Sequence, residues 1–349
     1  MRRRIICILT AVVIFTVSML CGCVLEPINR NGKLSIVTTC FPPYDFTRAV
    51  TGDSADITML LQAGAEAHSY EPVPLDIAKI QNCDVFVYVG GEGEVWVDKI
   101  LDSIDTSDIE IIRLFDFVDP LEEEEVEGAS PNGHKHHHHE GEDHDEDECD
   151  DEDCDEHHHD DEEDGEYDEH IWTSPRNAML CVEGIQAAMT SAFPENEELY
   201  HSNSFTYCEK LSALDTAFRE MSEGTPNHTI IVGDRFPFRY LAHDYGLKYY
   251  AAFSGCSSES EPSVYTMAYL IDKLLEEDNN YVFYLEFSTK KLAEKLSDAT
   301  GAHMLRLHSC HNVSKSDFRS GVTYIDLMEE NFKNIQEALY WKLFSNVKT

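Results

Sequence analysis

Histidine and acidic side chains are concentrated in one stretch of the chain, residues 121–169. Neutral imidazole is a preferred ligand of zinc, copper and nickel, and the interspersed carboxylates raise the local concentration of divalent cations. The pattern therefore predicts a segment that collects metal ions. An acidic spacer that only keeps a surface protein soluble is the alternative, but solubility does not require so many histidines. They are His134, His136, His137, His138, His139, His144, His157, His158 and His159.

The same stretch is almost free of apolar side chains. Ordering a residue costs about 1–2 kcal/mol of backbone entropy, and burial of apolar surface cannot offset that cost here. Like charges along the segment also repel one another. We therefore expect a disordered, solvated loop at 121–169 that carries the metal-binding histidines.

Other histidines stand where predicted strands or helices begin or end. His68 lies on a loop that glycine and proline bound, and His170 stands where the acidic stretch meets a helix. His308 and His311 follow a predicted strand. A single histidine is more often structural than a ligand, but four at such positions, in a chain that also has a histidine-rich loop, favour a metal site.

The elements that must position these histidines alternate between strand and helix in both halves of the chain. Short apolar runs, separated by segments with helical periodicity, indicate parallel strands covered by helices. The fold class we predict is α/β, with two lobes that each contain a parallel sheet flanked by helices. The predicted strands are 34–39, 57–61, 85–90 and 109–114 in the first lobe, and 229–232, 247–251, 281–285 and 303–307 in the second.

A long helical pattern separates the two lobes. An apolar stripe at helical spacing runs from Glu195 to Met221. At 1.5 Å per residue such a helix is about 40 Å long, so we expect a rigid helix that joins the lobes. A core-facing helix of one lobe is the alternative. The expected organisation is an N-terminal lobe at 34–120 with its end at 170–194, a linking helix at 195–222 and a C-terminal lobe at 223–349.

The N-terminus has the pattern of a secretion signal. Three arginines precede an apolar run at 5–20 that is short for a membrane-spanning helix. Gly22 and Cys23 then resemble a bacterial lipobox, in which Cys23 becomes the lipidated first residue. We therefore predict a signal peptide at 1–22, a tether at 23–33 and a location outside the cytoplasmic membrane. An uncleaved anchor helix is the alternative, with the same location.

The formal net charge is −41 over 349 residues, and a large share of the acid lies in the histidine-rich loop. With the loop and the N-terminal segment set aside, roughly 280 residues remain, enough for two domains with substantial cores. So acidic a chain is not expected to bind nucleic acid. Because the predicted location permits disulfides, Cys256 and Cys310, which fall in loop-like stretches, are a candidate pair.

Several short motifs occur in an order and spacing typical of a known family. They are YDF at 44–46, GAEAHSYEP at 64–72, VYVG at 87–90, WVD at 96–98, HIW at 170–172, YLA at 240–242, YGL at 245–247, EPS at 261–263 and KLA at 291–293. With them the mature chain resembles the zinc- and manganese-binding lipoproteins of ABC importers, the cluster A-I substrate-binding proteins. The resemblance implies a monomeric, membrane-anchored protein that is not an enzyme, captures zinc and delivers it to an ABC permease and its ATPase.

The resemblance also implies a ligand set. The family's first two metal ligands fall on His68 and His170. Its third, a His or Glu three residues before the Phe of a Phe-x-Tyr motif, falls on Arg235, whose permanently charged guanidinium cannot bind a metal. The fourth falls at or near His308, with His311 just beyond. We therefore expect a tetrahedral site of four imidazoles, which favours zinc over manganese because manganese prefers oxygen donors.

At Arg235 the sequence differs from the ligand pattern of the family. Other polar residues near this position are expected to support the site. Arg235 is predicted to pair with an acid, Asp234 or Glu261, behind the ligands. Asp234 and His243 are the alternative ligands, although His243 falls on a predicted helix face and is adjacent to another charged residue.

Two other functions remain open from the sequence. A zinc hydrolase could use the same ligands with Glu66 as its general base, but no His-Glu-x-x-His helix is present and four imidazoles leave no position for water. A surface adhesin or an extracellular zinc buffer would need the histidine-rich loop but no permease.

Overall fold

The computed structural model describes residues 32–124, 126, 166–257 and 261–345. Cys23, the signal peptide and the nine loop histidines lie outside the described residues, so the predictions about them are not tested. Within the described residues, none of the helices combines the length and the apolar character that a membrane crossing needs.

Four parallel strands form the first sheet, in the order β2-β1-β3-β4. Alternate side chains of its strands face opposite helices: Ile36 packs with α2 and α5, whereas Val37 packs with α3 and α4. The elements are β1 (Leu34–Thr38), α2 (Phe41–Thr51), β2 (Ala55–Met59), α3 (Pro74–Gln81), β3 (Val85–Tyr88), α4 (Val95–Leu101), β4 (Glu110–Arg113) and α5 (Pro175–Ala192).

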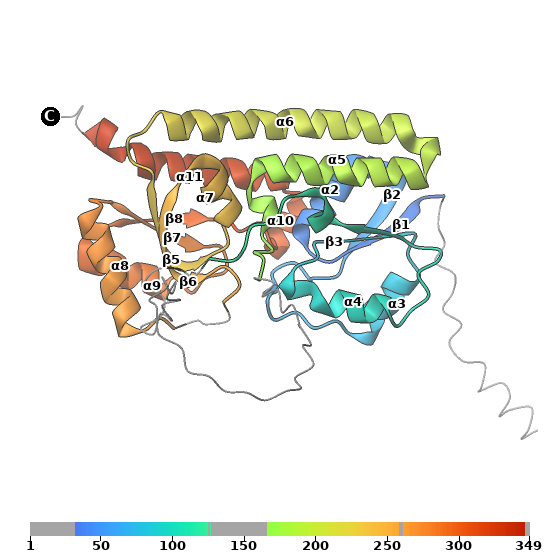
Figure 1. Ribbon diagram of the computed structural model, residues 1–349, viewed down its shortest axis with the longest axis horizontal. Helices are drawn as coiled ribbons and strands as arrows, with labels where there is room; N and C mark the ends of the chain where they lie inside the picture. Colours follow the sequence, from blue (N-terminus) through green and yellow to red (C-terminus); the bar gives the residue numbers. More distant parts are fainter. Residues whose placement is uncertain (1–31, 125, 127–165, 258–260, 346–349) are drawn as a thin grey trace, which may run out of the picture.

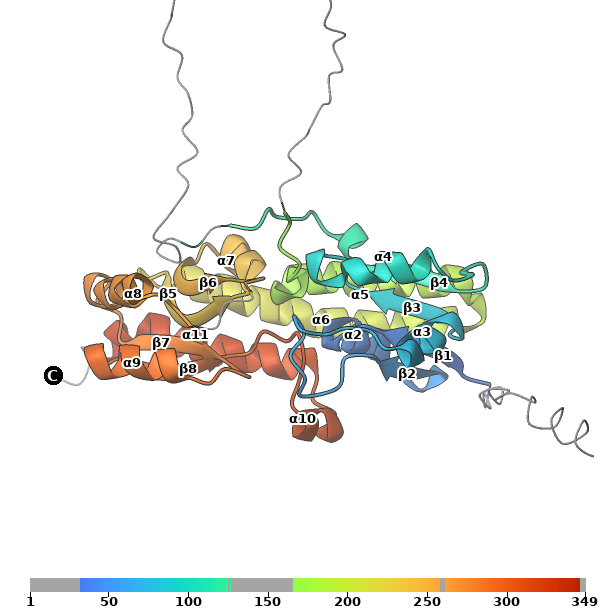
Figure 2. The same cartoon turned by 90° about the horizontal axis from the view of Figure 1, so that it is seen from below.

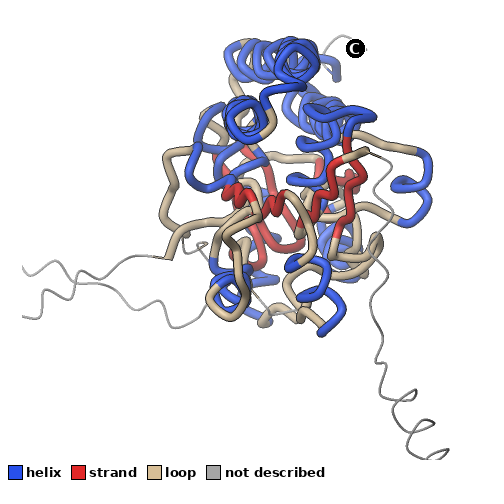
Figure 3. The backbone as a smooth tube through the Cα atoms, turned by 90° about the vertical axis from the view of Figure 1, so that its right-hand side faces the viewer, coloured by secondary structure: helices blue, strands red, loops and turns tan. Residues whose placement is uncertain are grey.

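The second sheet repeats this arrangement with strand order β6-β5-β7-β8, again all parallel. Helices α8 and α9 cover the face that carries Ile231, and the opposite face, with Ile230, packs in the core that α7 and α11 share. The elements are β5 (Thr229–Phe236), α7 (Arg239–Tyr245), β6 (Lys248–Ser254), α8 (Val264–Glu276), β7 (Tyr281–Leu285), α9 (Lys291–Thr300), β8 (His303–Leu307), α10 (Lys315–Ser320) and α11 (Tyr324–Ser345). The predicted two-lobe α/β fold class is confirmed, and Figure 3 shows the strands between layers of helices.

Helix α6 (Glu197–Glu223) joins the two lobes. It contacts α2 and α5 of the first lobe and α7 and α11 of the second. Figure 1 shows it running above both sheets, and Figure 2, seen from below, shows the two lobes side by side in front of it. With 27 residues it is about 40 Å long, so the long joining helix predicted from the sequence is confirmed.

A buried carboxylate fixes this helix to both lobes. Asp45 of α2 accepts hydrogen bonds from the Tyr207 hydroxyl of α6 at 2.7 Å and from the Tyr324 N–H of α11 at 2.8 Å, and it pairs with Arg48. Burial raises the pKa of Asp45, although the Arg48 guanidinium acts in the opposite direction. These contacts hold α2, α6 and α11 in one arrangement and give the lobes a rigid frame.

Regular structure extends into both ends of the stretch that we expected to be a disordered loop. Glu122 and Tyr167 form an antiparallel bridge, and the Glu123 N–H donates to the Glu166 carbonyl at 2.7 Å. We call residues 121–124 and 166–168 the stem. The prediction of a loop over all of 121–169 is wrong at both ends, because backbone pairing there does not depend on apolar side chains.

The stem lies against the second lobe. The Tyr240 hydroxyl accepts the Leu121 N–H at 3.0 Å and donates to the Asp168 carbonyl at 2.8 Å. Nε of Arg239 donates to the Glu122 carbonyl at 2.6 Å. The stem therefore fixes the position at which the chain re-enters the first lobe.

Cys256 and Cys310 do not form the disulfide considered from the sequence. Both are free thiols, Cys310 buried and Cys256 partly exposed. The prediction that each of them lies in an irregular segment is confirmed.

Candidate metal site

Four side chains from the two lobes converge between the sheets. One ligand atom each from His68, Glu169, His170 and His311 lies within 4.8 Å of the other three. The imidazole centroids are 5.7 Å apart for His68 and His170, 5.3 Å for His68 and His311, and 5.6 Å for His170 and His311. Three imidazole nitrogens and one carboxylate oxygen are a donor set that suits a tetrahedral divalent metal ion.

His68 lies on the loop between β2 and α3, and the second lobe holds this loop in place. The Asn312 amide donates to the carbonyls of Gln62 at 2.9 Å and Ala65 at 2.8 Å, and the Gly64 N–H donates to Val313 O at 2.8 Å. The His68 side chain is 18% exposed. His311 is also partly exposed, whereas His170 is buried, so a metal ion can reach the group from solvent at His68 and His311.

His170 is oriented by the residue two positions before it. Oδ1 of Asp168 accepts the His170 backbone N–H at 2.7 Å and contacts Nδ1 of the ring at 3.0 Å. The other ring nitrogen, Nε2, is buried and has no hydrogen-bond partner among the described residues. A ring held through Nδ1 with a free Nε2 is the usual arrangement of a metal-binding histidine.

His311 reaches the group because the chain turns sharply after β8. Cys310 has a φ of 60°, in the left-handed region, and the residue that follows faces the first lobe. There the His311 ring lies 4.9 Å from the Trp172 ring, centroid to centroid. Nε1 of Trp172 donates to the Ser309 carbonyl at 2.8 Å, which fixes the segment from the other side.

Glu169 was not among the ligands proposed from the sequence. Its carboxylate is 4% exposed, with Oε1 3.7 Å from Nδ1 of His68 and Oε2 accepting the Gly93 N–H at 2.6 Å. A Cβ atom at Gly91 or Gly93 would lie 2.4–2.5 Å from the Glu169 side chain, so both glycines make room for it. The sequence signal was its position next to His170. Because it is one of many acidic residues at the end of an acidic stretch, this signal did not distinguish it from the others.

Burial keeps two of the imidazoles neutral. It lowers the pKa of His68 to about 3, and the neighbouring His170 acts in the same direction. Burial also lowers the pKa of His311 to well below its usual value. Burial likewise opposes a charge on His170, but the Asp168 carboxylate outweighs it and raises the pKa of that ring. Neutral imidazoles have the free electron pair that a metal ion needs.

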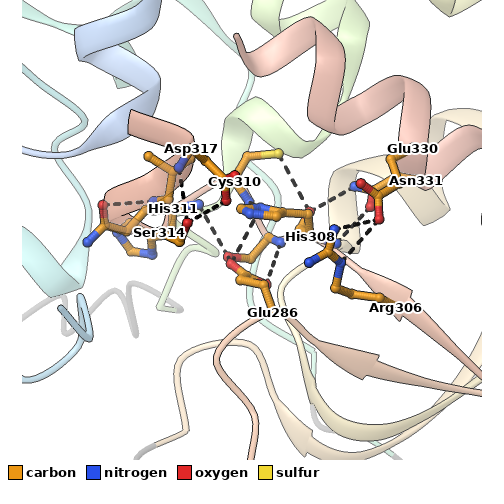
Figure 4. A network of polar contacts seen from close by, with 12 residues as sticks. Glu286, Arg306, His308, Cys310, His311, Ser314, Asp317, Glu330 and Asn331 are labelled. Carbon is orange, nitrogen blue, oxygen red and sulfur yellow. Dashed lines mark hydrogen bonds and ion pairs between the residues drawn. The ribbon is translucent and has the colours of Figure 1, made fainter. Parts of the chain in front are cut away.

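His308 is not brought to the group, contrary to our expectation. Nδ1 of His308 accepts the Cys310 N–H at 3.0 Å, and its backbone pairs with the Asn331 side chain. Figure 4 shows this network, in which Glu286 lies 3.6 Å from the ring. Burial lowers the pKa of His308. We therefore replace His308 with Glu169 in the proposed ligand set, because the turn at Cys310 directs only His311 toward the first lobe.

Arg235 lines the same cavity as His68, His170 and His311. Its Nη1 lies 3.3 Å from Oε1 of Glu66, on the first-lobe loop. The expected pairing with Asp234 or Glu261 is therefore wrong: Asp234 also lines the cavity, but its carboxylate accepts the backbone N–H groups of Arg235 and Leu285.

The remaining candidates lie at the surface. His243 is 60% exposed on α7 and contacts Asp244 at 3.1 Å. Glu261 is exposed. Neither belongs to the group of four, so the surface interpretation of His243 fits its position better than a role as ligand.

Replacement of Asp168 by asparagine is expected to weaken metal binding by roughly 10- to 100-fold, because the carboxylate that orients His170 and strengthens its basicity is lost. The measurement is competition for zinc against a chelator of known affinity. The thermal midpoint of the metal-free variant is the control for folding. An unchanged affinity in a folded variant would contradict the orienting role of Asp168.

Another carboxylate, that of the partly exposed Glu94, lies close to the group. Oε2 of Glu94 accepts the N–H groups of Val89 at 2.8 Å and Gly90 at 2.9 Å, and the residue lines a small cavity with His68 and His311. Burial raises the pKa of Glu94 to about 7 from 4.5. The folded protein therefore holds this proton more tightly than the unfolded chain does.

Glu94 is expected to contribute a part of the stability of the metal-free protein that is lost as pH rises from 4.5 to about 7, whereas the lowered pKa values of His68 and His311 act in the opposite direction. The shift corresponds to at most about 3 kcal/mol. In Glu94→Gln this part of the pH dependence should disappear. Urea unfolding at pH 5 and pH 8, in the presence of a chelator, measures it, with exposed Glu92→Gln as the matched control. Equal pH dependence in both variants would be the contrary result.

Residues 36–338 match the protein family described as ZnuA, zinc-uptake complex component A, periplasmic. The zinc-binding lipoprotein AdcA of Streptococcus pneumoniae is 34% identical over 311 residues, which are 89% of this chain and 56% of AdcA. The high-affinity zinc uptake system protein ZnuA of Bacillus subtilis is 32% identical over 314 residues, 90% of each chain. The chain therefore spans little more than half of AdcA but nearly all of ZnuA.

Solved structures have the same architecture. The Zn(II)-bound ZnuA-like domain of Streptococcus pneumoniae AdcA superposes with a TM-score of 0.68 at 31% identity, covering 88% of this chain and 99% of that domain. The match extends over both lobes and α6, the elements that bring the four side chains together.

Proposed function

Because the chain belongs to the family of the periplasmic component A of zinc-uptake complexes, we propose that it captures zinc outside the cytoplasmic membrane and delivers it to an ABC permease. The observation that carries this proposal is the convergence of three imidazoles and the buried Glu169 carboxylate between the lobes. The family consists of substrate-binding proteins rather than enzymes, which removes the hydrolase alternative.

The donor set supports zinc as the ion that is carried. Three imidazoles and one carboxylate would surround the ion at about 2.0–2.2 Å, and such nitrogen-rich tetrahedral sites suit zinc better than manganese. Ligand atoms of such a site are about 3.3 Å apart, so the four side chains would close in around the ion by small rotations. His68 and His170 belong to the first lobe and His311 to the second, so the ion would join the two.

The proposal includes the parts of the chain outside the described residues. Lipidation at Cys23 would hold the protein at the membrane surface beside its permease and ATPase. The histidine-rich loop would collect zinc close to the cleft, since the stem connects it directly to Asp168, two residues before His170.

Zinc titration of three proteins tests the capture step. They are the chain from residue 24, the same chain without residues 127–165, and His68→Ala. Because the Glu123 N–H and the Glu166 carbonyl are 2.7 Å apart, a short turn can replace the deleted segment. We expect one tight site that survives the deletion and is lost in His68→Ala. Loss of all tight binding with the loop would overturn the cleft site and favour an extracellular zinc buffer.

Growth tests the delivery step. A host that lacks this gene should grow poorly in zinc-depleted medium and recover with the intact gene but not with the His68→Ala form. Equal recovery with both forms would contradict delivery through the cleft. A surface adhesin without a transport role would produce no growth defect at all.

A further inference from the structure

The four strands of the second sheet end at one edge, and three of them send side chains to the metal cavity there. Arg235 is the last residue but one of β5, Glu286 follows β7, and His311 follows β8. The strand β6 lies next to β5, with Arg235 paired to Phe253 and the next residue paired to Ser254. The loop that follows β6 is therefore placed to supply a ligand where Arg235 cannot.

Cys256 is the second residue after β6. Gly255 before it lines the cavity with the three histidines, and a Cβ atom at Gly255 would lie 3.4 Å from Oδ2 of Asp168. The Cys256 N–H donates to Oε1 of Glu123 in the stem, at 3.3 Å. This loop is thus packed against the segment that carries Asp168 and His170.

The Cys256 thiol and the His170 imidazole each affect the pKa of the other, which places the two groups in the same neighbourhood. His170 is 1% exposed, and its Nε2 has no hydrogen-bond partner of regular geometry among the described residues. A thiol beside a buried, unpartnered imidazole nitrogen is the arrangement from which one metal ion can bind both atoms.

We propose that Cys256 provides a thiolate ligand to the zinc ion, in the position that Arg235 leaves without one. The inference rests on the proposed function, because it concerns the same cleft. The sulfur is not among the four atoms within 4.8 Å of one another, so the side chain turns toward the imidazoles as the ion enters. The thiol proton leaves to water and the sulfur donates an electron pair to the metal.

A thiolate would set the selectivity of the cleft. Soft sulfur ligands favour zinc, whereas manganese favours oxygen donors. With Cys256 bound, the site has three imidazoles and one thiolate, and Glu169 serves as an additional ligand or as an acceptor beside them. The chain would then discriminate against manganese more strongly than a site of imidazole and carboxylate alone.

Cobalt absorption tests the proposal directly, because Co²⁺ bound to a thiolate shows a sulfur-to-metal charge-transfer band in the near ultraviolet. The full chain is titrated with less than one equivalent of Co²⁺, in parallel with Cys256→Ser and Cys208→Ser. Cys208 is a partly exposed thiol on α6 and provides the matched control. We expect the band in the wild type and in Cys208→Ser, and its loss in Cys256→Ser.

Zinc affinity provides the second measurement. Cys256→Ser should bind zinc roughly 100-fold more weakly, with little change for manganese. Bound cobalt without the band in the wild type, or an equal band in Cys256→Ser, would overturn the proposal. His68→Ala separates this outcome from failure of the proposed function: if that variant binds cobalt as tightly as the wild type, the cleft itself is not the site.

Discussion

Replacement of His311 by alanine is expected to weaken zinc binding by about two to three orders of magnitude. Four-ligand structural zinc sites contribute about 10–16 kcal/mol, or roughly 3–4 kcal/mol for each ligand. His311 is the histidine that the second lobe contributes to the group, at 5.3 Å from His68 and 5.6 Å from His170 between ring centroids. Without His311, only the ligands of the first lobe, and Cys256 if it binds as proposed, would hold the ion. Competition against a chelator of known affinity measures the effect.

His308→Asn is the matched control, three residues away. An asparagine oxygen can accept the Cys310 N–H that now donates to Nδ1 of His308 at 3.0 Å, so the turn before His311 should be kept. We expect nearly unchanged zinc affinity and a small loss of stability. If His308→Asn weakened binding as much as His311→Ala did, the ligand set that the sequence suggested would be restored and the revised one abandoned.

Zinc is expected to stabilise the folded protein strongly, because the ion joins the two lobes. A ligand present at 1,000 times its dissociation constant adds about 4 kcal/mol to the free energy of unfolding. For a chain of this size that corresponds to a rise of roughly 7 °C in the thermal midpoint. A chelator should reverse the rise, and calorimetry with and without zinc measures it.

The thermal measurement also separates the cleft from the histidine-rich loop. A segment that binds metal equally well in the folded and unfolded states does not shift the folding equilibrium. Zinc should therefore raise the midpoint equally with and without residues 127–165, and should have little effect in His311→Ala. If the rise in the thermal midpoint were lost on deletion of the loop but kept in His311→Ala, a metal ion held between the lobes would be contradicted.

The alternation of strands and helices could be predicted from the sequence because it depends on patterns of residues that are close together in the chain. Apolar runs such as 85–88 become buried strands, and the stripe through Leu211, Leu214 and Phe218 becomes the buried face of α6. Each of these signals depends on residues close in sequence, so it survives without knowledge of the partner surface.

The site was predictable only in part, for the same reason. His68, His170 and His311 could be named because each stands on a loop between predicted elements. Whether His308 or His311 joins the other ligands depends on one backbone angle, the φ of 60° at Cys310. No residue pattern in the sequence predicts this angle. The pairing of Arg235 with Glu66 joins residues far apart in sequence, and it depends on how the two lobes meet.

The sequence alone therefore determined the fold class, the joining helix and the chemistry to expect, namely metal binding by imidazole. The tertiary structure decided which donors converge: it added Glu169 and removed His308. The physical reason is that strand and helix formation depends on near neighbours along the chain. A metal site depends on side-chain directions at the ends of several strands, and these directions are fixed only when the two lobes pack against each other.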